Sequence, residues 1–120
     1  MSSYGTRFHS IVAKYPFQRW QQSGLEQYTE ASCTAFAEVF DKLIARLVNL
    51  GEHATEQAKL DVIKGAVEEL NALNDEDDSL IETGEREELC ELVNLVASAC
   101  SLDPGRYGDG EGPASEWRKW

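Results

Sequence analysis

The sequence contains no run of about 20 consecutive apolar residues, which is the length that a transmembrane helix needs. This absence excludes a helix that crosses the bilayer. The opening segment Met1–Ser10 also lacks the basic stretch and the following apolar block of a secretory signal peptide. We therefore expect neither insertion into a membrane nor export by that route.

Cysteine is scarce, because the chain has three cysteines, which is an odd number. Cys33, Cys90 and Cys100 do not show the C-x-x-C spacing of zinc sites or of thioredoxin-like redox motifs. A chain in which 42% of the residues are hydrophobic can build a core without a framework of disulfides. The sequence thus predicts reduced thiols in a cytoplasmic protein.

Basic residues are few, since 11 lysines and arginines stand against 22 acidic residues, for a formal net charge of −11. Such a charge repels nucleic acids and anionic membrane surfaces, and it attracts cationic partners within a Debye length. We therefore predict a basic protein partner. We expect no binding of nucleic acid, membrane or small-molecule substrate.

Strict alternation of apolar and polar residues is missing, and helical spacing takes its place. Tyr28–Leu50 carries one apolar stripe, and Gly51 follows it as a C-terminal cap. Thr55 is placed to cap a second helix, and Thr83 to cap a third that ends at Asp103-Pro104-Gly105. The stripes comprise Phe36, Val39, Phe40, Leu43, Leu47 and Leu50, then Leu60, Ile63, Ala66, Val67, Leu70 and Leu73, and last Leu89, Leu92, Val93, Val96 and Cys100.

The two ends of the chain are less regular. Helical spacing from Phe8 to Tyr15 predicts a short helix that Pro16 ends, and an irregular segment over residues 17–25 then folds onto the core. Residues 102–120 are predicted to form an irregular tail, with a flexible turn at the glycine-rich residues 108–112. Residues 1–120 thus form a single all-α domain, a bundle of about four to five helices.

The pattern of residues offers little to catalysis. His9 and His53 stand alone in the sequence, and Glu56 lies at a helical spacing from His53 without a second histidine. The glycine-rich segment 108–112 follows no strand, and its acidic residues would oppose a phosphate. We therefore predict that the protein is not an enzyme and needs no cofactor.

The acidic segment that begins at Asp75 invites a test for calcium binding, because oxygen-rich loops bind hard cations. An EF-hand loop that starts there has Leu80 where the turn glycine belongs and Arg86 where the bidentate glutamate belongs. The motif therefore fails, and we predict no metal site. A looser cation site made from the same carboxylates stays open as an alternative to a solvated loop.

The negative charge is concentrated in one stretch. Asp75–Glu91 holds nine acidic residues and a single arginine, and so carries −8 of the net −11. Such a patch can steer a cationic protein into contact, although a merely solvated acidic face is the alternative. At the chain end, Trp117 is expected to clamp the core, whereas Trp120 can also anchor an interface. The predicted partner-binding residues are Asp75, Glu76, Asp77, Asp78, Glu82, Glu87, Glu88, Glu91 and Trp120.

Three segments of the C-terminal third carry a resemblance: Asp77–Leu92, Leu102-Asp103-Pro104 and Ser115–Arg118. Here the chain resembles the small bacterial immunity proteins of contact-dependent growth inhibition and related polymorphic toxin systems. The resemblance implies a cytoplasmic antitoxin that binds one cognate toxin domain, commonly a nuclease, and blocks its active site or a neighbouring surface. It favours an RNA-cleaving toxin of the EndoU type, and it does not extend to Met1–Gly51.

Three hypotheses about function follow from the sequence. The first is an immunity protein whose acidic segment Asp75–Glu91 contacts a basic toxin domain. The second is a helical adaptor or regulatory subunit for another basic protein. The third is an enzyme that uses the carboxylate cluster, and it ranks last because no nucleophile, base or ligand set is organised around those carboxylates.

Overall fold

The structure is a computed structural model that describes residues 3–23, 28–76 and 81–120. These residues form helices and turns and no strand, so the prediction of an all-α bundle is confirmed. None of the described helices has the length and apolarity to cross a membrane. The elements are α1 Ser3–Arg7, α2 His9–Val12, α3 Phe17–Gln21, α4 Glu30–Leu50, α5 Glu56–Glu76, α6 Thr83–Ala99, the 3-10 turns η1 Pro104–Arg106 and η2 Gly108–Gly110, and α7 Ala114–Trp117.

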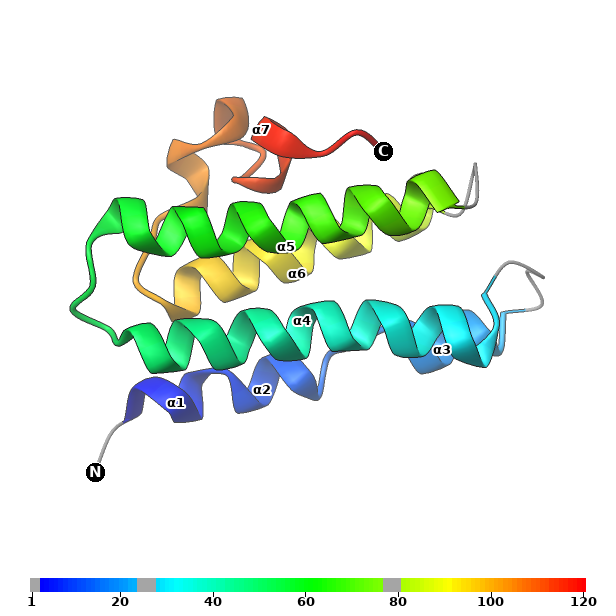
Figure 1. Cartoon of the computed structure of the whole chain (residues 1–120), viewed down its shortest axis with the longest axis horizontal. Helices are drawn as coiled ribbons and strands as arrows, with labels where there is room; N and C mark the ends of the chain where they lie inside the picture. Colours follow the sequence, from blue (N-terminus) through cyan, green and yellow to red (C-terminus); the bar gives the residue numbers. More distant parts are fainter. Residues whose placement is uncertain (1–2, 24–27, 77–80) are drawn as a thin grey trace.

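Three long helices form the body of the bundle. Figure 1 shows α4 and α5 side by side and antiparallel, with α6 behind them and the short helices α1 to α3 along the other side of α4. The tail after α6 turns back, and α7 lies against α5 and α6. Both the N-terminal helices and the C-terminal tail therefore pack onto a scaffold made by α4, α5 and α6.

Local signals fix most ends of the long helices. The Thr29 side chain accepts a hydrogen bond from the Ser32 amide (3.1 Å), and Gly51 ends α4 with a positive φ of 93°. Thr55 accepts one from the Ala58 amide (3.1 Å), as predicted. The predicted cap of α6 is wrong by one residue, because the Glu82 carbonyl already accepts the Arg86 amide (2.8 Å) and Thr83 is the first helical residue.

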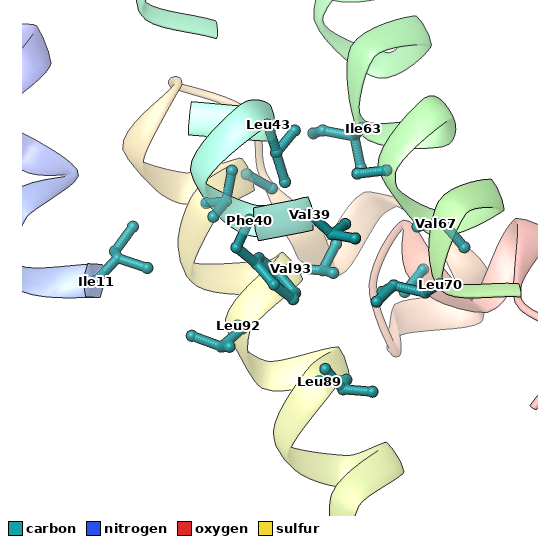
Figure 2. Close-up of a cluster of buried hydrophobic side chains, with 14 of the residues drawn as sticks. Ile11, Val39, Phe40, Leu43, Ile63, Val67, Leu70, Leu89, Leu92 and Val93 are labelled. Carbon is teal, nitrogen blue, oxygen red and sulfur yellow. The ribbon is translucent and has the colours of Figure 1, made fainter. Parts of the chain in front are cut away.

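One core joins all the helices, and Figure 2 shows side chains of α2, α4, α5 and α6 meeting in it. The segment after Pro16, predicted to be irregular, is instead the helix α3. The Trp20 amide donates to the Pro16 carbonyl (3.0 Å), which closes a helical turn and buries both Phe17 and Trp20. Leu25, at the end of the segment predicted to fold onto the core, lies outside the described residues.

A buried lysine joins two distant parts of the chain. Lys59 on α5 is only 4% exposed, and its Nζ donates to the carbonyl oxygens of Glu52 (2.6 Å) and Cys100 (2.7 Å). The Cys100 carbonyl lies at the C-terminal end of α6, where the helix dipole favours a cation. Lys59 thus ties α6 to the turn between α4 and α5.

Candidate protein interface on helix α6

Helix α6 presents two carboxylates on one exposed face. Glu87 and Glu91 are both exposed, and their spacing of four residues places them one above the other. Neither carboxylate forms a hydrogen bond or an ion pair with a described residue. We call this pair the acidic ridge. Asn94, which lies three residues after Glu91 on α6, is half-buried because the tail folds over it.

A cleft of about 340 Å³ runs along one side of the acidic ridge, between α6 and the C-terminal tail. The tail contributes a third exposed carboxylate, Glu111, to its wall. The arginines Arg86 and Arg118 are half-buried in the same cleft, so its lining carries both signs of charge. The full lining is Arg86, Glu87, Cys90, Glu91, Asn94, Glu111, Ser115 and Arg118.

A smaller cleft of about 220 Å³ lies on the other side of the acidic ridge. Lys14 and Pro16 form its far wall, and Leu92 and Leu95 of α6 contribute apolar surface. Glu91 lines both clefts and therefore stands on the crest between them. A convex, charged crest with a hollow on each side offers shape as well as charge to a partner.

Glu88, one of the predicted partner-binding residues, is engaged inside the protein. Its two carboxylate oxygens accept from Arg19 Nη1 (3.1 Å) and Nη2 (2.5 Å), and Oε2 also accepts from the Trp20 indole N–H (3.2 Å). These contacts attach α3 to α6. Glu88 thus belongs to the packing of the bundle, and we do not count it in the acidic ridge.

The tail wall of the larger cleft is held in place by close contacts. Asn94 Nδ2 donates to the Glu111 carbonyl (3.2 Å), and the Ser115 hydroxyl donates to the Glu111 carboxylate (3.2 Å). The glycine-rich segment, predicted to be a flexible turn, is a closed turn in which the Gly110 and Gly112 amides both donate to the Tyr107 carbonyl. These contacts fix Glu111 opposite the acidic ridge.

Gly112→Ala is expected to destabilise the protein more than Gly110→Ala does. Both glycines have a positive φ, but a Cβ at Gly112 would lie 1.9 Å from Asn94 Oδ1, whereas a Cβ at Gly110 meets open space. Backbone strain alone should lower the free energy of unfolding by about 1 kcal/mol at Gly110. The added clash should raise the loss to about 2 kcal/mol at Gly112. Urea unfolding measures both, and equal losses would contradict the close approach.

Two more of the predicted acidic residues are exposed elsewhere in the described structure. Asp75 is exposed near the end of α5, and Glu82 is exposed at the start of α6. Glu76 ends α5, and its side chain lies outside the described residues, as do Asp77 and Asp78. Of the predicted acidic residues, the structure thus brings Glu87 and Glu91 together in the acidic ridge.

The two terminal tryptophans pack on the bundle. Trp117 is half-buried against the core, in agreement with its predicted role as a clamp. Trp120 is half-buried against the core as well, and the Arg118 guanidinium lies 5.7 Å from the centre of its ring. Trp120 is thus part of the folded tail in this structure.

The two histidines and Cys90 lack the surroundings of a metal site or an activated thiol in the described structure. His9 and His53 are both exposed, and no three histidine, cysteine or acidic side chains among the described residues come together in a way that could hold a metal. Burial raises the pKa of the Cys90 thiol, and the nearby Arg118 and Arg86 only oppose that shift. A raised pKa disfavours the thiolate, which is the reactive form of a cysteine.

The arrangement around α6 suits recognition by charge and shape. The acidic ridge stands on a regular helix, so a partner meets carboxylates that are already in position. Glu111 joins them through the fold of the tail, and no sequence signal predicts this because the residue is distant along the chain.

No protein-family model, curated protein or solved structure matches the chain.

Proposed function

We propose that the protein is an immunity protein that binds a basic toxin domain through the acidic ridge and neutralises it. The observation that carries this proposal is the pair of exposed carboxylates, Glu87 and Glu91, which have no partner among the described residues. Glu111 across the larger cleft extends the negative surface onto a second element. Inhibition by binding requires no chemistry from the inhibitor itself.

Electrostatics explains why a nuclease is a fitting target. A nuclease carries a basic surface because its substrate is a polyanion, and an acidic protein competes for that same surface. The net charge of −11 increases the rate of encounter with such a partner. The acidic ridge then supplies local contacts that a diffuse charge cannot supply.

The resemblance to immunity proteins also supports α6 as the binding surface. Its longest segment, Asp77–Leu92, includes both residues of the acidic ridge. An RNA-cleaving toxin of the EndoU type is the target that this resemblance favours. The adaptor or regulatory subunit is the second candidate, because the same ridge would serve any basic protein.

Co-expression tests the proposal directly. Cells that produce the toxin domain encoded beside this gene should survive when they also produce this protein, and should die when they produce an unrelated acidic helical protein at the same level. Death at equal rates in both cultures would contradict the immunity function. A neighbouring gene that encodes no toxin would instead favour the adaptor.

A further inference from the structure

Asn71 on α5 holds the backbone of the segment Trp117–Trp120 on the bundle, and the rings of Trp117 and Trp120 pack against the core. We call this segment the C-terminal strap. Asn71 on α5, which is 8% exposed, donates from Nδ2 to the Trp117 carbonyl (3.0 Å) and accepts at Oδ1 from the Lys119 amide (2.9 Å). A single amide group thus pairs with both a donor and an acceptor of the strap backbone.

The docked strap also buries polar atoms that lack partners. The Arg118 Nε and the Trp120 indole N–H are buried and form no hydrogen bond. They are two of four such side-chain atoms in the described part of the chain, and the other two belong to Glu69 and Asn94. A buried donor without an acceptor is unfavourable, and it regains hydrogen bonds to water once it is exposed. Docking of the strap is therefore opposed by its own side chains.

A hollow already separates part of the strap from α6. The cleft of about 340 Å³ has Arg118 of the strap on its wall, and Cys90 of α6 faces the same space. The strap consequently lacks close packing along this seam. Its attachment depends on the Asn71 hydrogen bonds and on the half-buried rings of Trp117 and Trp120.

We propose that the C-terminal strap is a latch that detaches from α5 and α6 while the rest of the bundle stays folded. Detachment breaks the two Asn71 hydrogen bonds, returns the Arg118 and Trp120 donors to water, and removes the Arg118 wall of the cleft that Cys90 lines. It therefore enlarges the hollow beside the acidic ridge. This behaviour belongs to the isolated protein and does not depend on the proposed toxin.

Alkylation of the thiols measures detachment in the intact chain of residues 1–120. Cys90 is half-buried beside the strap, whereas Cys33 and Cys100 are buried in the core and react only when the bundle opens more widely. Iodoacetamide labelling, followed residue by residue with mass spectrometry, reports both events in one sample. The ratio of the Cys90 rate to the Cys100 rate isolates the movement of the strap.

Two variants should raise that ratio. Asn71→Ala removes both tethering hydrogen bonds. If each bond makes the net contribution that is typical of buried hydrogen bonds, the ratio of the Cys90 rate to the Cys100 rate should rise roughly 10-fold to 30-fold. Lys119→Pro removes one of them, leaves the core untouched, and should raise it roughly fivefold. Arg118 already has an extended backbone (φ −67°, ψ 147°), which a following proline accepts. The control Asn49→Ala changes an exposed asparagine of α4 and should leave the ratio within about twofold.

A higher ratio in Lys119→Pro, with the far-ultraviolet circular dichroism unchanged, supports a latch even if Asn71→Ala fails to fold. Equal acceleration of Cys90 and Cys100 would show that the strap leaves only when the whole bundle unfolds. An unchanged ratio in Lys119→Pro would show that the Asn71 tether does not control access to the cleft. Either of these two results would overturn the proposal.

Discussion

Phe36→Ala is expected to lower the free energy of unfolding by about 4 kcal/mol, because the change deletes a large buried ring and leaves a cavity in its place. Phe36 is 0% exposed and lies at the centre of the aromatic packing between α3 and α4. Its ring centre is 5.8 Å from that of Phe17 and 5.5 Å from that of Trp20. Such aromatic pairs stabilise beyond the area they bury. Urea unfolding followed by circular dichroism measures the loss.

Two controls separate the cavity from a general effect of substitution in α4. Phe36→Leu keeps most of the apolar volume and should cost about 1.5 kcal/mol. Val48→Ala, on the same helix but 41% exposed, should change stability by less than about 0.5 kcal/mol. A loss below about 1 kcal/mol for Phe36→Ala would contradict the central place of this ring.

Reversing three charges on α6 is expected to weaken binding to the proposed basic partner on the order of 100-fold, mostly through slower association. The variant carries Glu82→Lys, Glu87→Lys and Glu91→Lys, all at exposed positions. It reverses both carboxylates of the acidic ridge together with Glu82, which lies outside the ridge at the start of the same helix. Attraction becomes repulsion, and the effect should shrink as salt screens the charges. Surface plasmon resonance at low and high salt measures both rates.

A matched control has the same change in net charge on other helices. Glu38→Lys on α4, with Asp61→Lys and Glu68→Lys on α5, also reverses three exposed carboxylates. This control should reduce the association rate only by the smaller factor that net charge explains. If both triple variants lose affinity equally, the partner senses the overall charge of the protein, and the acidic ridge has no special role.

The long helices could be predicted because their signals are local. Apolar spacing and the caps at Gly51 and Thr55 lie within a few residues of the helices they define. The helix α3 could not be predicted in this way, since five residues after a proline show no period of their own. Its conformation follows from burial of Phe17 and Trp20 against α4, which is a tertiary effect.

The acidic ridge was predictable in part for the same reason. Helical periodicity places Glu87 and Glu91 away from the apolar stripe, and both are exposed. Glu88 lies one residue along, and its pairing with Arg19 joins positions 69 residues apart in sequence. The contact of Asn94 with Glu111 likewise depends on how the tail folds back. Such long-range partners leave no periodic trace in a single sequence.

Inhibition of the purified toxin domain tests the central claim most directly. RNA cleavage by that domain should fall to background at an equimolar amount of this protein. The control variant, in which the charges of Glu38, Asp61 and Glu68 are reversed, should inhibit nearly as well. The Glu82, Glu87 and Glu91 variant should need a large molar excess, since its acidic ridge is reversed. Full inhibition by this variant at equimolar amount, or cleavage that continues with the unaltered protein, would contradict the account.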